Sequence, residues 1–203
     1  MREHVGDEGS EGCPQVSELL GWSLPERPDE VPSLEWLVER LRSSRPDWRL
    51  LQGLVRFDPE RYARRVLART PACELLLVCW MPGQVSGVHD HGGSSGVSWV
   101  VRGQLQETRF CWGGDRLLPA CRTGADEGEF LLEQPETIHR IHNASRHGAV
   151  SVHLYAPPMS GMTRYDASVM PAPEAELLRR GVLRPPRPPA DAEAARRRRP
   201  RAT

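Results

Sequence analysis

Hydrophobic residues in the first third of the chain recur at helical spacing. Residues 16–48 carry this pattern, and its clearest repeat, at i, i+3, i+4 and i+7, is formed by Leu34, Leu37, Val38 and Leu41. Side chains at these intervals fall on one face of a helix. Ser33 precedes the repeat and is a residue type that caps helix N-termini. A second short helix is predicted over residues 59–68.

From residue 74 onward the pattern changes to short apolar runs separated by turn-forming residues. The runs with strand character cover residues 74–80, 96–102, 104–112, 129–132 and 149–155. Arg102-Gly103 and Gly113-Gly114-Asp115 mark turns between neighbouring runs. Many short strands at regular spacing predict a mainly β fold, an antiparallel sandwich or jelly roll, preceded by N-terminal helices.

Composition divides the chain into four predicted parts. They are a disordered N-terminus (1–16), a helical part packed on the barrel (17–70), a β-barrel with a metal site (71–170) and a C-terminal extension (171–203). Within the extension a short helix is predicted over 174–182, and disorder from about residue 185. The run Arg196–Arg199 is interpreted as a solvated terminus, with nucleic-acid binding as the alternative.

Charge and cysteine content exclude several classes of protein. The 27 acidic residues balance 27 basic ones, all of them arginine, so the net charge gives no argument for a nucleic-acid or membrane partner. No stretch approaches the roughly 18 apolar residues of a membrane span, and the first residues lack the apolar core of a signal peptide. The five cysteines contain no C-x-x-C pair, so reduced thiols and a cytoplasmic location are expected.

Three histidines are the candidate metal ligands. His89 and His91 flank Asp90, and in an extended segment residues at i and i+2 point to the same side. Asp90 points the other way and is not counted as a ligand. A third imidazole from the distant His139 would complete a three-nitrogen face around one metal ion, with the opposite coordination positions open for chemistry.

The surrounding residues resemble the two sequence motifs of the cupins, small antiparallel β-barrels with ligands at the barrel mouth. The matching positions are Gly83, His89, His91 and Gly103 in the first motif and Gly128, Pro135, His139 and Asn143 in the second. His142 and His147 are competing candidates that do not fit this spacing. The carboxylate ligand of most cupins is missing, because its position falls on Ser95 and Gly96. Three neutral imidazoles leave the full charge on a divalent metal, which suits an anionic substrate such as a thiolate.

Alternation in the last predicted strand places polar side chains on one face. Ser151, His153 and Tyr155 share this face, while Val152 and Leu154 occupy the other. In a barrel interior the three polar groups would form a buried hydrogen-bonded row that ends at the Tyr155 phenol. The alternative is the solvated face of an amphipathic strand.

Together these features resemble the cysteine dioxygenase family of thiol dioxygenases over residues 58–165. The strings that carry the resemblance are Tyr62-x-Arg64, Cys79-Trp80, His89-Asp90-His91, Ile138-His139-Arg140 and Ser151-Val-His153-Leu-Tyr155-Ala-Pro157-Pro158. The resemblance implies one Fe(2+) per chain, with His89, His91 and His139 as its ligands. It implies that Tyr155 is the active-site tyrosine, backed by His153 and Ser151, and that Arg64, with Tyr62 near it, holds the substrate carboxylate.

The resemblance also implies an activity, the oxidation of L-cysteine by O2 to cysteine sulfinate, and a candidate cis peptide at Ala156-Pro157. A monomer is expected. Mammalian members carry a cysteine crosslinked to the active-site tyrosine. Gly96 occupies that position here, as in bacterial members, so no such crosslink can form at this position. Two alternatives stay open, a 3-mercaptopropionate dioxygenase and a non-catalytic metal-binding cupin.

Overall fold

The computed structural model describes residues 16–44, 48–166 and 169. Its elements, in chain order, are α1 (Val16–Leu20), α2 (Leu34–Ser44), α3 (Trp48–Gln52), β1 (Ala63–Arg69), β2 (Glu74–Trp80), β3 (Ser95–Arg102), β4 (Gln104–Gly113), β5 (Arg116–Asp126), β6 (Phe130–Glu133), β7 (Ile138–His142) and β8 (Ala149–Ala156). The expectations for the N-terminal disorder, the helix over 174–182 and the C-terminal tail fall outside the described residues.

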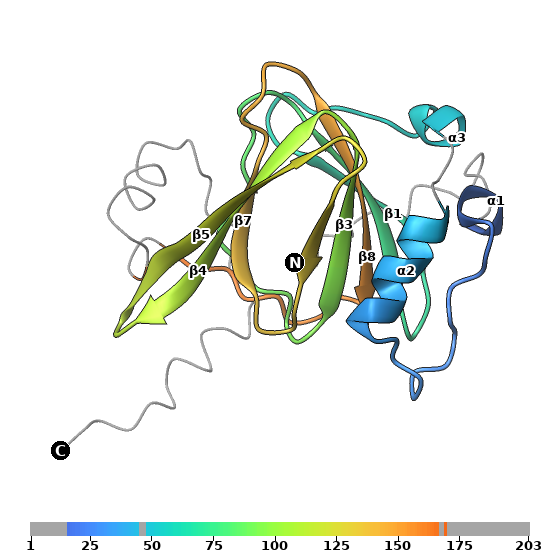
Figure 1. Cartoon of the computed structure of the whole chain (residues 1–203), viewed down its shortest axis with the longest axis horizontal. Helices are drawn as coiled ribbons and strands as arrows, with labels where there is room; N and C mark the ends of the chain where they lie inside the picture. Colours follow the sequence, from blue (N-terminus) through green and yellow to red (C-terminus); the bar gives the residue numbers. More distant parts are fainter. Residues whose placement is uncertain (1–15, 45–47, 167–168, 170–203) are drawn as a thin grey trace, which may run out of the picture.

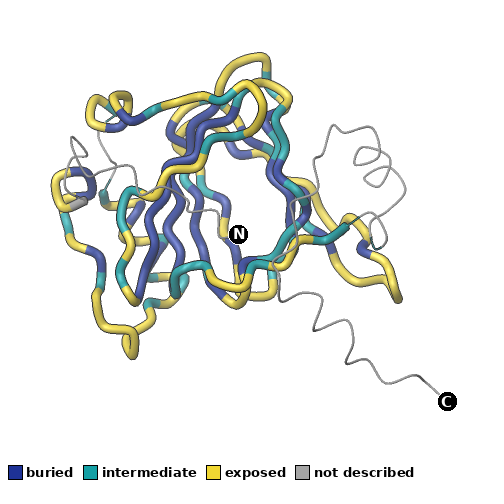
Figure 2. The backbone as a smooth tube through the Cα atoms, turned by 180° about the vertical axis from the view of Figure 1, so that it is seen from behind, coloured by how far each residue is buried: buried dark blue, intermediate teal, exposed yellow. Residues whose placement is uncertain are grey.

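Two antiparallel sheets face each other in the described part of the chain (Figure 1). The larger sheet has the strand order β1-β2-β8-β3-β6, and the smaller one has the order β5-β4-β7. The buried stretches of backbone follow the central strands, whereas β5 and most of the connecting loops are exposed (Figure 2). The predicted mainly β, jelly-roll architecture is confirmed, although the two sheets do not join into one closed barrel.

The central strands of the larger sheet, β2, β8 and β3, are buried on both faces, and their side chains alternate between two cores. The outer core, between the sheet and the helices, includes Leu37, Leu41, Leu75, Leu77, Val152 and Leu154. The inner core, between the two sheets, includes Leu76, Val78, Trp80, Val100, Leu105 and Tyr155. Since successive strand residues point to opposite faces, the alternation of β8 directs Ser151, His153 and Tyr155 into the space between the sheets.

The predicted amphipathic helix is present as α2. Ser33 caps its first turn, with the backbone N–H of Trp36 donating to the Ser33 hydroxyl at 3.3 Å. Leu37 and Leu41 are completely buried against the larger sheet. The predicted helix therefore covers the outer face of the larger sheet and leaves the inner face free for polar groups.

The short helix predicted over residues 59–68 is wrong, because residues 63–69 form the edge strand β1. β1 pairs antiparallel with β2, with Arg64 opposite Val78. A turn at Thr70 joins the two strands. The Thr70 hydroxyl accepts hydrogen bonds from the backbone N–H groups of Ala72 and Cys73. Pairing with a buried neighbouring strand overrode the local helical pattern.

The strand pattern of the remaining chain was predicted with two omissions. β6 lies one residue later than the predicted run, and β5 and β7 were not predicted. β5 is mostly exposed, with only Leu117 and Ala125 buried along its length, so it lacks the alternation that marks a strand. β5 forms because it pairs with β4 along its whole length, across the predicted Gly113-Gly114-Asp115 turn, and this pairing compensates for the few buried side chains of β5.

The expectation of reduced thiols holds for the four cysteines in the described residues. Cys73 and Cys79 are buried free thiols, and Cys111 and Cys121 are exposed free thiols. Cys13 lies outside the described residues. Burial raises the pKa of Cys73 to about 11, so this thiol stays protonated at neutral pH. In the described part of the chain, no helix has the length and apolar character needed to cross a membrane.

Candidate metal centre

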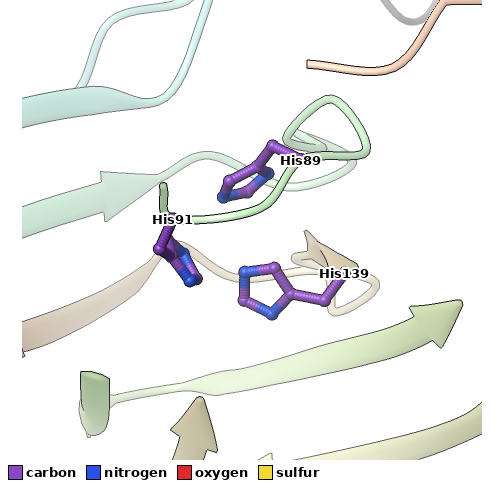
Figure 3. A group of neighbouring side chains, drawn as sticks. All are labelled: His89, His91 and His139. Carbon is purple, nitrogen blue, oxygen red and sulfur yellow. The ribbon is translucent and has the colours of Figure 1, made fainter. Parts of the chain in front are cut away.

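Three histidine rings meet between the two sheets (Figure 3). Their ring centroids lie 4.8 Å apart for the pairs His89–His139 and His91–His139, and 5.1 Å apart for His89–His91. One nitrogen from each ring lies within 4.8 Å of the other two. His91 and His139 are almost completely buried, and His89 is partly exposed. The structure thus brings together the three histidines that the sequence singled out.

Backbone pairing fixes the distant His139 beside the first two histidines. The N–H of each of His89 and His139 donates to the carbonyl of the other at 2.9 Å. His142, at the end of β7, instead forms a bridge with Val85, and His147 is exposed on the following loop. His139, and neither competitor, therefore joins the cluster. Asn143 supports the loop, with its amide donating to the carbonyls of Trp80 and His147.

Asp90 points away from the cluster, as expected. Its carboxylate accepts hydrogen bonds from the N–H groups of Gly92 and Thr163 and from the Tyr165 hydroxyl at 2.8–3.0 Å. Burial raises the pKa of Asp90, but these hydrogen bonds outweigh burial and leave the pKa below its usual range. Asp90 therefore fastens the segment around Thr163 to the histidine loop.

Each of the three histidines has at least one ring nitrogen available as a metal ligand. The Nδ1–H of His89 donates to the carbonyl of Gly87 at 2.8 Å, and the Nδ1–H of His139 donates to Glu107 at 2.7 Å. In this tautomer both Nε2 atoms carry a lone pair. His139 Nε2 and both nitrogens of His91 are buried without a hydrogen-bond partner. Buried polar atoms are rarely left unpaired, so the three donors fit a bound divalent metal.

Burial keeps the imidazoles of His89 and His91 neutral, which is the form that binds metal. Burial, with a smaller effect of His139, lowers the pKa of His91 to about 3. Burial likewise holds the pKa of His89 well below its usual range. Burial raises the pKa of Glu107, but the hydrogen bond from His139 and the charge of Arg109 outweigh it and lower the pKa overall. Glu107 is therefore ionised and orients the His139 ring.

Replacing Glu107 by glutamine is expected to weaken metal binding by about 10- to 100-fold, because the partner of a ligating histidine fixes its tautomer and raises its basicity. Competition with a chromophoric chelator would measure the affinity. Glu127→Gln, a substitution in an exposed carboxylate, serves as the matched control. Equal affinities for the two variants would contradict a role of Glu107 at the metal.

The polar row predicted on β8 is present and buried. Ser151 Oγ lies 2.7 Å from His153 Nε2, and His153 Nδ1 lies 3.1 Å from the Tyr155 hydroxyl. The indole N–H of Trp80 donates to Ser151 Oγ at 3.0 Å. The Tyr155 ring is 4.9 Å from the His91 ring, centroid to centroid. The Ala156-Pro157 peptide that ends this strand is cis, as the resemblance implies.

Three residues of this region were not predicted, namely Ser98, Glu107 and Glu133. Ser98 lies opposite His153 in the pairing of β3 with β8, and Glu133 lies opposite Gly96 in the pairing of β6 with β3. Glu133 ends the otherwise apolar strand β6, which was an available signal, whereas Glu107 lies between polar residues of β4 and gave none. Their partners follow only from strand register, which the sequence does not display.

Protein stability is expected to fall as the pH drops from 6.5 towards 4. Burial lowers the pKa of His153 from 6.5 to about 4. The unfolded chain therefore binds a proton in this range that the folded protein does not bind, and each such proton tilts the unfolding free energy by about 1.4 kcal/mol per pH unit. Urea unfolding at several pH values would measure the slope. His153→Gln should flatten the slope by up to one proton, and equal slopes in the native and His153→Gln proteins would disprove the assignment.

The histidines and Tyr155 open into one pocket. The space between its lining atoms is about 430 Å³, including its open mouth, and its apolar lining includes Leu76, Val78, Ile141, Met159 and Met162. Tyr62 stacks on Trp80 with ring centroids 4.6 Å apart. Arg64, on β1, lines the same pocket. Its side chain is 41% exposed and contacts the buried Glu74 at 3.3 Å.

The amino-acid sequence is similar to those of proteins named cysteine dioxygenase. The profile of the family described as cysteine dioxygenase type I matches residues 27–168. The cysteine dioxygenase type 1 of Danio rerio is 30% identical over 146 residues, which cover 67% of this chain and 70% of that protein. The enzyme of the same name from Rattus norvegicus is 28% identical over 142 residues, with the same two coverages.

Among solved structures, the chain is similar to a conserved protein with a double-stranded β-helix domain from Klebsiella pneumoniae. The identity is 19%, the alignment covers 57% of this chain and 94% of that chain, and the TM-score is 0.48. The family profile, by contrast, spans well over half of the 203 residues. The chain therefore belongs to the cysteine dioxygenase type I family.

Proposed function

We propose that this protein is an iron(II)-dependent thiol dioxygenase that converts L-cysteine to cysteine sulfinate, with one Fe(2+) per chain held by His89, His91 and His139. One observation carries the proposal: the three bare imidazole nitrogens, the Tyr155 hydroxyl and the Arg64 guanidinium all line one pocket. A passive metal site has no need of the last two groups. The free thiols of the chain fit a reducing cytoplasm.

The reaction needs no further electron donor. The thiol RSH and O2 combine to RSO2H, so the sulfur gains both oxygen atoms and loses four electrons, which the dioxygen takes up. Iron bound at the histidine face supplies the redox chemistry between thiolate and dioxygen. The protein contributes binding and orientation.

Each remaining group of the pocket has a role in this proposal. Arg64 holds the substrate carboxylate through a two-pronged, charge-assisted hydrogen bond, and Tyr62 borders it on the Trp80 side. 3-Mercaptopropionate has no amine, so its carboxylate would be needed at the iron. A carboxylate held by Arg64 instead suits L-cysteine, whose amine could bind the metal beside the thiolate. Tyr155 offers its hydroxyl to the reacting sulfur or oxygen, and His153 and Ser151 orient it. The apolar lining limits access of water.

The test is oxygen uptake by the purified, iron-loaded protein. L-Cysteine is expected to be consumed with one O2 per thiol, and the sulfinate formed under ¹⁸O2 should carry both labelled atoms in its mass spectrum. Faster turnover of 3-mercaptopropionate would overturn the substrate assignment. Iron-loaded protein that consumes no oxygen with any small thiol would support a non-catalytic metal-binding cupin instead.

A further inference from the structure

A carboxylate outside every sequence motif lies at the buried end of the polar row. Glu133, the last residue of β6, is completely buried. Its Oε1 accepts the Ser98 hydroxyl at 2.8 Å, and Ser98 Oγ lies 2.7 Å from His153 Nδ1. The second oxygen, Oε2, is buried without a hydrogen-bond partner. A buried acid is costly unless its contacts serve a purpose.

The carboxylate end of the row determines the direction of the hydrogen bonds at His153. The Trp80 indole can only donate, and a carboxylate at Glu133 can only accept. Ser151 accepts from Trp80, which leaves its own proton free to donate to His153 Nε2. Ser98 donates to Glu133, so it accepts from His153 Nδ1. His153 therefore carries its proton on Nδ1.

This tautomer decides what the Tyr155 hydroxyl can do. The phenol oxygen lies 3.1 Å from His153 Nδ1. A protonated Nδ1 can donate to that oxygen but cannot accept the phenol proton. The opposite tautomer would present a lone pair at Nδ1 and draw the phenol proton away from the pocket. With the Nδ1–H form, His153 does not take up that proton, and the hydroxyl keeps it for another acceptor.

Gly96 makes room for the carboxylate beside the ring. A Cβ atom at this position would lie 2.3 Å from Tyr155 Cε1 and 2.5 Å from Glu133 Oε2. The bare glycine backbone thus lets both groups converge on one spot. The edge of an aromatic ring carries partial positive charge, so a carboxylate there favours one ring orientation.

We propose that Glu133 is a positioning residue that acts through Ser98, holding His153 in its Nδ1–H tautomer so that the Tyr155 hydroxyl can donate a hydrogen bond to the bound thiol or dioxygen. The catalytic part of this inference rests on the proposed function. The tautomer itself does not, and it can be measured without turnover.

The first test is the tautomer of His153 by ¹⁵N NMR of the full-length, ¹⁵N-histidine-labelled protein with Zn2+ added as a diamagnetic ion. The resonances are assigned from their loss in His153→Gln. The native protein should show the Nδ1–H form. In Glu133→Leu no acceptor remains for the Ser98 proton, so Ser98 can donate to His153 Nδ1 and the Nε2–H form should appear. An Nε2–H native protein, or an unchanged tautomer in Glu133→Leu, would overturn the inference.

Two further variants separate this role from a general loss of structure. Glu136→Gln, in an exposed carboxylate just after the same strand, should leave the tautomer native. Ser98→Ala removes the link and leaves the Glu133 carboxylate in place, so it should release His153 from the single Nδ1–H form. A fixed Nδ1–H form in Ser98→Ala would show that Ser98 transmits nothing.

The second test is a double-mutant cycle with Tyr155→Phe on L-cysteine oxidation. Glu133→Leu should lower kcat by roughly tenfold with little change in KM, and it should cause no further loss in Tyr155→Phe, because the group that Glu133 positions is gone. Equal losses in both backgrounds would overturn the inference. Native protein that oxidises no thiol would refute the proposed function, while the NMR result would still decide the tautomer.

Discussion

His139→Ala is expected to abolish iron binding and thiol oxidation together. Two imidazoles would remain, and the buried Glu107 would lose the N–H that it accepts at 2.7 Å. Since loss of a residue behind a ligand costs 10- to 100-fold in metal affinity, loss of a ligand should cost more than about 100-fold. Iron content per chain after desalting, and oxygen uptake with L-cysteine, would measure the two effects.

The matched control for this variant is His142→Ala, three residues further along. His142 is partly buried at the end of the same strand but stands outside the cluster. It should retain full iron content and activity. Stoichiometric iron in the His139→Ala protein would refute the three-histidine site, and loss of iron in the His142→Ala protein would show that His142 had been wrongly excluded.

Arg64→Gln is expected to raise KM for L-cysteine with a smaller effect on kcat. A two-pronged bond between guanidinium and carboxylate contributes about 3 kcal/mol, which corresponds to roughly 100-fold in binding. The contact with buried Glu74 is lost as well, although Arg69 still lies 3.7 Å from that carboxylate. The thermal stability of the variant should therefore be measured together with its steady-state oxygen uptake, so that a loss of stability is not mistaken for a change in KM.

Cysteamine and Arg65 provide the controls for this prediction. Cysteamine is L-cysteine without its carboxylate, so any turnover of it should be insensitive to Arg64→Gln. Arg65, the exposed neighbour on β1, has its side chain on the opposite face of the strand, so Arg65→Gln should leave KM for L-cysteine unchanged. The same KM for L-cysteine in native and Arg64→Gln proteins would mean that another group holds the carboxylate.

The helix predicted over residues 59–68 is wrong for a reason that the local sequence cannot reveal, because strand β1 forms there instead. Residues 63–69 contain three arginines and four small or apolar side chains, a composition compatible with either a helix or an edge strand. Their pairing with β2 satisfies the backbone and turns Arg64 towards the pocket. A fully buried strand such as β2, by contrast, was recognisable from its continuous apolar run.

The sequence by itself determined which side chains could bind a metal and which side chains share one face of a helix or strand. The spacing of His89 and His91, the apolar face of α2 and the alternation of Ser151, His153 and Tyr155 are local properties, because a side chain's direction along a helix or strand repeats with a fixed period. Only the tertiary structure decided which distant groups complete the site. Glu107 meets His139, and Ser98 and Glu133 meet His153, through strand pairings between segments far apart in the chain. Register across such distances is set by the packing of both sheets at once, so no local pattern encodes it.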